Sequence, residues 1–391
     1  MIKLHEPFIR GNEWRYVKNC LDEGWVSSAG KYVDLFEKKI AQYTGSKYAI
    51  ACINGTAALQ ISLKLVGVGI NTEVIVPSMT FIAPVNAISY NNAKPVFMDN
   101  NKYYTIDINK TLAFLNKETR TIKRKKSLIT INKKTGKRIA ALMVVHLFGN
   151  AVKLDELNKL CKKKNIPLIE DSAESIGTFY GSGRFKNKHT GTVGQIGCLS
   201  FNGNKIITSG GGGMILTNNL KTANKAKYLT TQAKDDSVNY VHNDIGYNFR
   251  LSNIHAALGL AQLENLSKNI RKKKIIHNIY KSKIDKYKSL KISGVPHSEK
   301  SNYWLNILEI SKKLTKKKFS KIIQKFNKYG IEVRPLWFPN HLQKKYKRCQ
   351  VYKLNNIKNI YQKRLCLPSS PQLTFKQQNF VCKKLNSIFK K

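Results

Sequence analysis

The sequence predicts an α/β domain with a mainly parallel sheet, followed by a smaller α+β region. Between about residues 47 and 217, short apolar runs alternate with helix-like stretches. Several runs are apolar without interruption, as expected for strands that helices bury on both faces. After about residue 252 the alternation gives way to a long helical pattern and a few further strands. These observations favour a parallel sheet flanked by helices, with a second core behind it.

The elements of the large domain follow from this pattern in chain order. The predicted strands cover residues 47–53, 73–78, 94–99, 139–148, 166–171, 196–201 and 213–217. Amphipathic stretches between them, such as 56–68 and 152–164, predict helices that pack on the sheet. Ligands bind beyond the carboxyl ends of strands in such sheets. The residues that follow each strand are therefore the candidates for chemistry.

Two further segments shape the predicted domain organisation. Residues 117–138 are strongly basic and poorly patterned, which predicts a surface insertion, a small hairpin, in the large domain. Residues 253–284 are predicted to form one long amphipathic helix that leads to strands at 302–310 and 330–336. We therefore expect a large domain at residues 1–262 and a small α+β domain at 263–391.

Composition limits the class of protein. With 391 residues and 42% hydrophobic residues, the chain is long and apolar enough for two globular cores. The seven cysteines are scattered without a CxxC pair, which argues against a disulfide framework and against a zinc site, so no metal is expected. No apolar stretch has the length of a membrane span, and the first residues lack the apolar run of a signal peptide. We expect a cytoplasmic protein that does not bind membranes.

The formal net charge of +46 raises the question of nucleic-acid binding. Only 11 of the 69 basic residues are arginine, the residue that reads bases and phosphates by paired hydrogen bonds. The lysines are spread along the whole chain, which is typical of a solvated surface. We expect no nucleic-acid partner but an attraction for anionic small molecules. The alternative is a non-catalytic regulatory or nucleic-acid-binding protein that uses this basic surface.

Four strand ends carry candidate site residues. Gly55 and Thr56 follow the first strand and open a helix, which favours a phosphate cradle, although the same residues also suit a helix cap. Phe81 follows the second strand and could stack on a planar ligand or belong to the core. Asp171 ends the strand at 166–171, and Glu174 follows one helical turn later. A carboxylate there could hold a ring nitrogen protonated.

The last strand end combines a hydroxyl and an amine. Ser200 closes the run at 196–201 and could bind a phosphate, while Lys205 stands in the turn that follows, before the glycines at 210–213. A positioned lysine can form a Schiff base with a carbonyl compound, although surface lysines are abundant in this chain. The alternatives among glycine-rich motifs fail, because the segment lacks the spacing of a P-loop and no G-x-G-x-x-G follows the first strand.

Taken together, these segments resemble the DegT/DnrJ/EryC1/StrS family of sugar aminotransferases, which use pyridoxal 5'-phosphate on the fold-type-I scaffold. The resemblance runs from residue 23 to the segment around His341 and rests on NGTAAL, VPSMTF, IEDSAES, LSFNGNKIITSGGGGM and IGYNFRLSNIHAALGLAQL in this order. Residues 227–259 and the insertion around 117–138 are most similar to LegC-like enzymes, which serve pathways to nonulosonic acids such as legionaminic acid.

The resemblance implies a role for each candidate residue. Lys205 matches the Schiff-base lysine, and Asp171 matches the partner of the pyridine nitrogen. Glu174 stands where the family has a polar residue, often Gln, beside the ring hydroxyl. The other implied cofactor contacts are Phe81 on the ring, Gly55, Thr56 and Ser200 on the phosphate, and Asn248 on the phosphate in the neighbouring subunit. Trp25, Ser27, Arg250 and His341 fall in segments that line the sugar-nucleotide site in relatives.

The resemblance also implies partners and a reaction. The expected amino donor is L-glutamate, and the expected acceptor is a nucleotide-linked 4-keto-6-deoxy sugar, with or without an N-acetyl group at carbon 2. The match of Asn248 implies a homodimer with two shared sites. Relatives with histidine at the lysine position dehydrate their substrates, so Lys205 favours the aminotransferase reaction. The nucleotide, the ketone position and the amine stereochemistry stay open.

Overall fold

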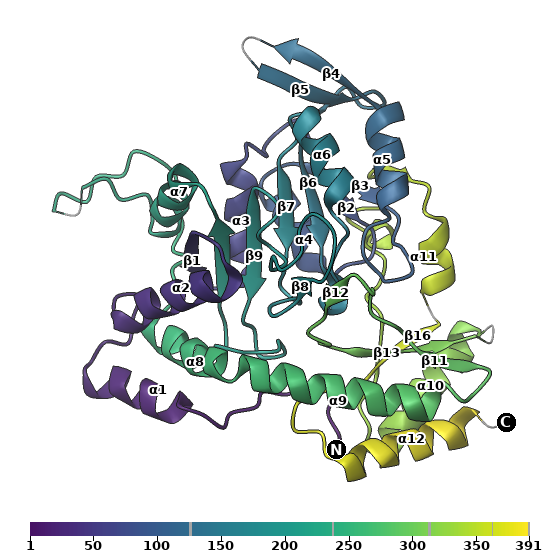
Figure 1. The fold of residues 1–391 in the computed structure, drawn as a ribbon. Coiled ribbons are helices and arrows are strands. Elements are labelled where there is room, and N and C mark those ends of the chain that lie inside the picture. The colour runs from purple at the N-terminus through teal and green to yellow at the C-terminus, as the bar shows by residue number, and fades with distance from the viewer. Residues whose placement is uncertain (125–126, 237, 312–313, 362, 390–391) are drawn as a thin grey trace.

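The computed structural model describes residues 1–391 except 125–126, 237, 312–313, 362 and 390–391 (Figure 1). A ten-stranded sheet lies at its centre, with the strand order β1-β10-β9-β7-β6-β2-β3-β15 and the pair β4-β5 attached beside β6. Along this order, β10 is antiparallel to both neighbours, whereas every other adjacent pair is parallel. The predicted mainly parallel sheet is confirmed.

The seven strands predicted for the large domain all form in the structure. They are β1 (Tyr48–Cys52), β2 (Thr72–Pro77), β3 (Lys94–Met98), β6 (Arg138–Val145), β7 (Leu168–Asp171), β9 (Ile196–Ser200) and β10 (Gly213–Thr217). An eighth, β15 (Val351–Tyr352), comes from far along the chain and pairs with β3. The carboxyl ends of the parallel strands therefore share one edge of the sheet, where the candidate residues were placed.

Helices cover both faces of this sheet (Figure 1). The helices of the first 264 residues are α1 (Glu13–Asp22), α2 (Lys31–Thr44), α3 (Gly55–Leu65), α4 (Ile82–Tyr90), α5 (Ile108–Lys117), α6 (Asp155–Lys163), α7 (Leu220–Thr230) and α8 (Asn253–Glu264). On β2, Val74 and Val76 pack with α3 and α4, while Ile75 packs on the opposite face with α5 and α6. Burial on both faces explains why these strands are continuously apolar.

The basic insertion forms the predicted hairpin. Strands β4 (Thr119–Arg124) and β5 (Ser127–Asn132) pair antiparallel and project from the body of the molecule (Figure 1). Residues 125–126 of the insertion lie outside the described residues. Only Ile131 of β5 pairs with the main sheet, at Arg138 of β6, so the hairpin is attached at its base.

The predicted long helix at 253–284 is interrupted by one residue. Helix α8 ends at Glu264, and α9 (Leu266–Ile284) begins after Asn265, whose N–H bonds to the carbonyl of Gln262 three residues back. The segment at residues 8–13 crosses here, since the Gln262 side chain donates to the carbonyl of Phe8 and to Glu13. A tertiary contact that no periodicity reveals therefore accompanies the break, and the prediction of a single helix is wrong by that residue.

The C-terminal region has its own sheet and core. The sheet has the order β11-β13-β16-β14, and α9, α10 and α12 pack against it. Its elements are β11 (Leu290–Ile292), β13 (Asn306–Ile310), α10 (Lys316–Lys328), β14 (Arg334–Pro335), α11 (Asn355–Ile360), β16 (Arg364–Leu367) and α12 (Phe375–Phe389). A further pair, β12 (Glu299–Lys300) with β8 (Phe179–Tyr180), links this region to the large sheet's loops. The boundary between residues 262 and 263 stays a prediction.

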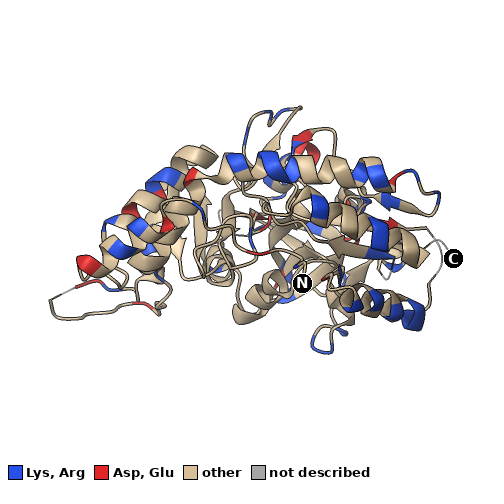
Figure 2. Ribbon diagram, turned by 90° about the horizontal axis from the view of Figure 1, so that it is seen from below, with Lys and Arg blue, Asp and Glu red and all other residues tan. Residues whose placement is uncertain are grey.

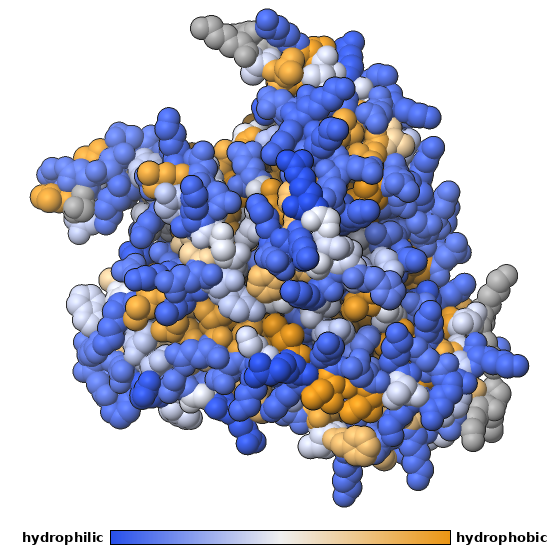
Figure 3. All heavy atoms as spheres, viewed as in Figure 1, coloured by the Kyte–Doolittle hydropathy of each residue, from blue (hydrophilic) through white to orange (hydrophobic). Residues whose placement is uncertain are grey.

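The surface is basic in most directions. Lys and Arg are distributed along many helices, with fewer acidic positions between them (Figure 2). In the space-filling view, hydrophilic side chains cover most of the visible face, and apolar ones appear at the end of the loop that projects beyond α7 (Figure 3). Across the described part of the chain, no helix has both the length and the apolar character needed to cross a bilayer.

Candidate active site

A cavity of about 380 Å³ opens at the carboxyl edge of the sheet. It is bounded by the ends of β1, β2, β6, β7 and β9 and, on its far side, by two tryptophans from the C-terminal region. The structure brings seven predicted residues into its lining: Gly55, Thr56, Phe81, Asp171, Glu174, Ser200 and Lys205. Residues from four strand ends, scattered over 150 positions of sequence, therefore meet in one place.

One wall is the start of α3. Asn54 caps this helix, with its side-chain oxygen accepting from the N–H of Ala57 at 2.8 Å. The first N–H groups of the helix, at Gly55 and Thr56, have no carbonyl partner within the helix. They form the positive end of the helix dipole. Ser200 lies directly beside them, because a Cβ on Gly55 would come within 2.8 Å of the Ser200 Cβ. This arrangement suits a phosphate.

Strand β10, which is antiparallel to both of its neighbours, connects the start of α3 with the end of β9, the strand that precedes Lys205. Gly213 opens β10 so close to Asn54 that an added Cβ would lie 2.5 Å from the Asn54 carbonyl carbon. Across β10's other edge, Gly213 pairs with Ser200 at the end of β9. Only glycine fits between the two backbones, so the glycine run brings the two strand ends together.

Lys205 reaches the cavity from a tight turn after β9. The turn is closed by a hydrogen bond from the Lys205 N–H to the carbonyl of Asn202, at 2.9 Å. The side chain is 11% exposed, and its Nζ lies 3.7 Å from Glu174 Oε1. Nζ also lies 4.6 Å from the centroid of the Trp304 ring. A mostly buried amine beside a carboxylate and an aromatic face differs from the many exposed lysines, and also from the buried Lys273, which donates to the carbonyl of Ser369.

Two carboxyl groups share the cavity with this amine. Burial raises the pKa of Asp171, an effect opposed by the Ala173 N–H and by the charges of Lys205 and His146. Burial also raises the pKa of Glu174, against the opposing charge of Lys205 and the N–H of Phe148, which donates at 2.8 Å. Two acidic groups facing one amine leave the cavity receptive to a further cation, such as a protonated ring nitrogen.

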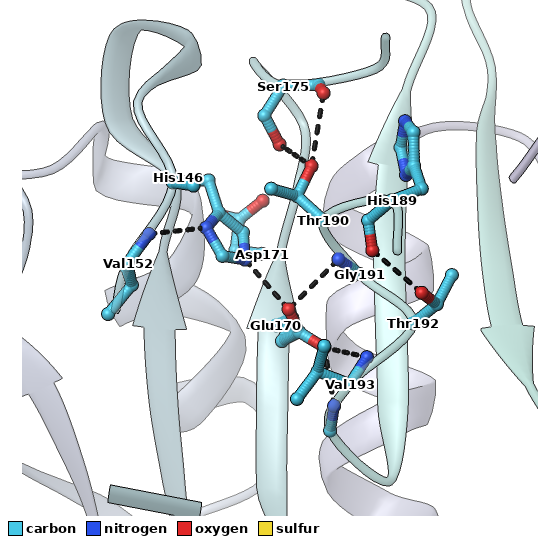
Figure 4. A network of polar contacts seen from close by, with 12 residues as sticks. His146, Val152, Glu170, Asp171, Ser175, His189, Thr190, Gly191, Thr192 and Val193 are labelled. Atoms are coloured by element: carbon cyan, nitrogen blue, oxygen red, sulfur yellow. Dashed lines mark hydrogen bonds and ion pairs between the residues drawn. The ribbon is translucent and has the colours of Figure 1, made fainter. Parts of the chain in front are cut away.

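A buried network stands behind Asp171 (Figure 4). Adjacent residues of a strand point to opposite faces, so Glu170 points away from the cavity. Its carboxylate accepts from His146 Nε2 at 2.9 Å and from the N–H groups of Gly191 and Val193 at 2.9 and 2.7 Å. Burial would raise the pKa of Glu170, but His146 and the N–H groups of Gly194 and Gly191 outweigh it and leave the pKa lowered. The network holds the end of β7 in place.

Aromatic rings close the remaining sides. Phe81 is 54% exposed and stands edge-on to Trp337, with ring centroids 6.1 Å apart. Trp304 is 1% exposed and stacks on Phe148 with an interplanar angle of 18°. Neither tryptophan was predicted from the sequence as a site residue. Each lies in or beside a strand predicted for the C-terminal region, and only knowledge that this region folds back over the sheet edge would have identified them.

Five predicted residues lie outside the cavity lining: Trp25, Ser27, Asn248, Arg250 and His341. Asn253 connects the segment of Trp25 and Ser27 with the segment of Arg250. Its buried side chain donates to the Trp25 carbonyl at 2.7 Å, and its backbone N–H donates to the Ser27 carbonyl at 2.6 Å. Trp25, Ser27 and Asn248 have exposed side chains. These residues form a neighbouring surface, and their contact with a ligand stays a prediction.

His341 occupies a separate position at the end of β2. Its Nδ1 pairs with the Ser78 hydroxyl at 2.6 Å, two residues before Thr80 of the cavity lining. Burial lowers the pKa of His341, with the charge of Asp99 opposing it. The imidazole is therefore favoured in its neutral form, beside the site but not in it.

The described residues contain no group of three or more His, Cys, Asp or Glu side chains arranged to bind a metal. The donor set of the cavity instead fits pyridoxal 5'-phosphate: a helix N-terminus and a hydroxyl for the phosphate, a carboxylate at depth for the ring nitrogen, and an amine between them. The cradle around Gly55, which a side chain would fill, is part of that fit.

Comparison with known proteins agrees with this chemistry. The model of the DegT/DnrJ/EryC1/StrS aminotransferase family matches residues 7–386. GDP-perosamine synthase of Escherichia coli O157:H7 is 34% identical over 99% of this chain and 98% of its own length. UDP-4-amino-4,6-dideoxy-N-acetyl-beta-L-altrosamine transaminase of Campylobacter jejuni (strain 81-176) is 29% identical over 94% of this chain and 92% of its own.

A solved structure supports the same assignment. The crystal structure of a DegT DnrJ EryC1 StrS aminotransferase from Brucella abortus superimposes with a TM-score of 0.86, covering 97% of this chain and 96% of that one at 25% identity. The chain therefore belongs to the DegT/DnrJ/EryC1/StrS aminotransferase family and is a pyridoxal 5'-phosphate-dependent aminotransferase.

Proposed function

We propose that this aminotransferase moves an amino group from L-glutamate to a nucleotide-linked 4-keto-6-deoxy sugar. The observation that carries the proposal is the meeting of Lys205, Asp171 and the start of α3 in one cavity. The names of the two relatives, which refer to GDP- and UDP-linked amino sugars, support a sugar nucleotide as acceptor. The strongly positive net charge favours such anionic substrates.

Each of the seven predicted residues in the cavity has a task in this proposal. When bound, pyridoxal phosphate supplies the electron sink that makes a neighbouring C–H bond acidic. Asp171 would hold the proton on the ring nitrogen, and Gly55, Thr56 and Ser200 would bind the phosphate. Phe81 would contact the ring, and Glu174 would serve the ring hydroxyl. The free amine of Lys205 takes and returns the proton at the reacting carbon, first on the donor and then on the acceptor.

We also propose that the enzyme works as a homodimer with shared sites. Trp25, Ser27 and Asn248 are exposed. The segment of Asn248 lies beside the cavity, since the Phe249 carbonyl accepts from the N–H of Ile53, next to Asn54 of the lining. The loop beyond α7 presents apolar side chains to the surface, with Val238 82% and Ile245 75% exposed. Exposed apolar groups of this size are typical of a protein–protein contact. A second copy could cover them and bring its Asn248 to this subunit's phosphate cradle.

The nucleotide, the sugar and the pathway stay predictions. The pathway we predict is the synthesis of amino sugars or of nonulosonic acids of the legionaminic type, for surface glycans. A panel of GDP-, UDP- and dTDP-linked keto-sugars, offered with glutamate, would identify the acceptor from the mass of the aminated product. A protein that binds duplex DNA in a salt-sensitive manner but aminates none of them would support the non-catalytic alternative.

Replacement of Lys205 is the direct test of the proposal. Lys205→Ala should abolish amine transfer and also remove the absorbance change that accompanies covalent capture of pyridoxal phosphate, because no other cavity residue carries an amine. The matched control is Lys221→Ala, since that lysine is exposed at the start of α7. Near-normal turnover in Lys205→Ala would overturn the assignment.

A further inference from the structure

Trp304 has a relation to Lys205 that the proposed reaction does not use. The Lys205 amine lies 4.6 Å from the centroid of the indole, well inside the range in which an aromatic face attracts a cation. Tryptophan is the strongest aromatic partner for such a contact. The carboxylate of Glu174 lies 3.7 Å from the same Nζ. The amine therefore lies close to both a carboxylate and an indole.

Hydrogen bonds fix the indole to the turn that carries the lysine. Trp304 Nε1 donates to the carbonyl of Asn204, the residue before Lys205, at 3.1 Å. The ring cannot move away from the amine without breaking this bond. Because Trp304 is also 1% exposed and stacked on Phe148, its orientation is set before any ligand arrives.

The same framework holds Glu174. The side chain of Asn302 accepts from the backbone N–H of Trp304 at 2.9 Å and donates to the backbone carbonyl of Glu174 at 2.9 Å. Phe148, whose ring stacks on the indole of Trp304, donates its backbone N–H to the Glu174 carboxylate at 2.8 Å. Asn302 thus connects the two backbones, and Phe148 connects the carboxylate with the indole.

We propose that the face of Trp304 and the carboxylate of Glu174 form a holding site for the amine of Lys205 in its protonated, unbound state. Trp304 is then a positioning residue: it returns the amine to one place each time the cofactor is transferred from the lysine to a substrate. This inference rests on the proposed function, because it gives the unbound lysine a repeated part in the cycle.

The test uses the apoprotein and does not depend on turnover. Covalent capture of pyridoxal phosphate consumes the unprotonated amine, so a site that stabilises the ammonium form slows capture at pH 7. Trp304→Leu should raise the capture rate, followed by absorbance, roughly three- to tenfold, the factor expected from loss of a desolvated cation–π contact. Trp304→Phe restores an aromatic face and should stay within about twofold of the wild type.

Trp14→Leu is the control, because that indole is 82% exposed on α1 and does not line the cavity. Its capture rate should stay at the wild-type value. If Trp304→Leu does not fold, as judged by circular dichroism, Trp304→Met takes its place, since it fills more of the volume without an aromatic face. An unchanged or slower rate in the variant without the ring, or the same acceleration in Trp14→Leu, would overturn the proposal.

The two proposals fail in different ways. If the wild-type apoprotein captures no pyridoxal phosphate at all, the proposed function fails. If it captures the cofactor and aminates a keto-sugar, while Trp304→Leu captures no faster, only the role of Trp304 fails.

Discussion

At the scale of single residues, Gly55 shows how a missing side chain builds a binding site. The helix can begin directly beside Ser200 because Gly55 brings no Cβ to the contact. The first N–H groups of α3 and the Ser200 hydroxyl then converge on one small volume. A phosphate bound there would contact backbone donors and a side chain together.

Gly55→Ala should weaken binding of pyridoxal phosphate. The new Cβ would lie 2.8 Å from the Ser200 Cβ and 3.3 Å from the Leu199 carbonyl oxygen, so the start of α3 must shift. Overpacking of this kind costs about 1–3 kcal/mol, so we expect roughly a tenfold or greater loss of affinity, measured by titrating the apoprotein. Gly203→Ala is the control, since nothing lies within 4 Å of its added Cβ. Equal affinities of the wild type and Gly55→Ala for pyridoxal phosphate would contradict this prediction and show that the start of α3 tolerates the methyl group.

Single residues also mark the limit of what the sequence predicts. Asp171 and Ser200 were identifiable because each ends a recognisable buried strand, and Lys205 because it stands in the turn after one of them; parallel strands end at one edge. Trp304 and Trp337 come from a region whose position over the cavity depends on tertiary packing. The hydrogen bond from Trp304 to Asn204 spans 100 residues, and no local pattern encodes it.

At the scale of elements, most of the large sheet was predictable and its interruptions were not. Continuous apolar runs identified the strands of the large domain because burial on both faces leaves little room for other residues. The division of α8 from α9 at Asn265 depends on a crossing by the N-terminal segment, which periodicity cannot reveal. Strand β15 has only two residues, too few for a hydrophobic pattern.

The short strand β12 carries a carboxyl group whose ionisation should affect stability. Burial raises the pKa of Glu299 to about 8, against the opposing N–H of Ala151, which donates to Oε2. In the unfolded chain this pKa is about 4.3. The folded protein thus binds the proton more tightly than the unfolded chain. The contribution of Glu299 to the free energy of unfolding is therefore full below about pH 4 and is lost progressively as the pH rises to about 8.

Glu299→Gln keeps the shape and cannot ionise, so it isolates this effect. The free energy of unfolding of the wild type should fall relative to the variant between about pH 5 and 8, by a few kcal/mol at most, and level off above that. Urea unfolding of both proteins at each pH measures the difference. Glu23→Gln, at an exposed carboxylate, is the control. Parallel curves for the wild type and Glu299→Gln would contradict the prediction.

At the scale of the whole molecule, we expect that two inactive variants of the proposed dimer can restore activity to each other when their subunits are mixed. Lys205→Ala lacks the amine, and Asn248→Ala lacks the group proposed to reach the neighbouring site. A mixed dimer contains one site with both defects and one with neither. Mixing the two inactive proteins under conditions that exchange subunits should therefore restore about a quarter of wild-type activity, if exchange is random.

The control for this experiment is a mixture of Lys205→Ala with Lys205→Ala/Asn248→Ala. Every site in it lacks the amine, so it should stay inactive. If the first mixture also stays inactive although mass measurement detects mixed dimers, the sites are not shared. If Asn248→Ala alone is fully active, Asn248 has no part in the site.

The close contact of Gly213 with Asn54 has a consequence for any redesign of this enzyme. Through β10, the start of α3 and the end of β9 form one rigid piece, so the anion cradle and the reactive amine cannot be adjusted separately. A change that widened the cradle for a bulkier anion would displace the amine as well. New acceptor specificity is therefore more accessible through the exposed segment around Trp25 and Ser27, which can vary while the chemical geometry stays constant.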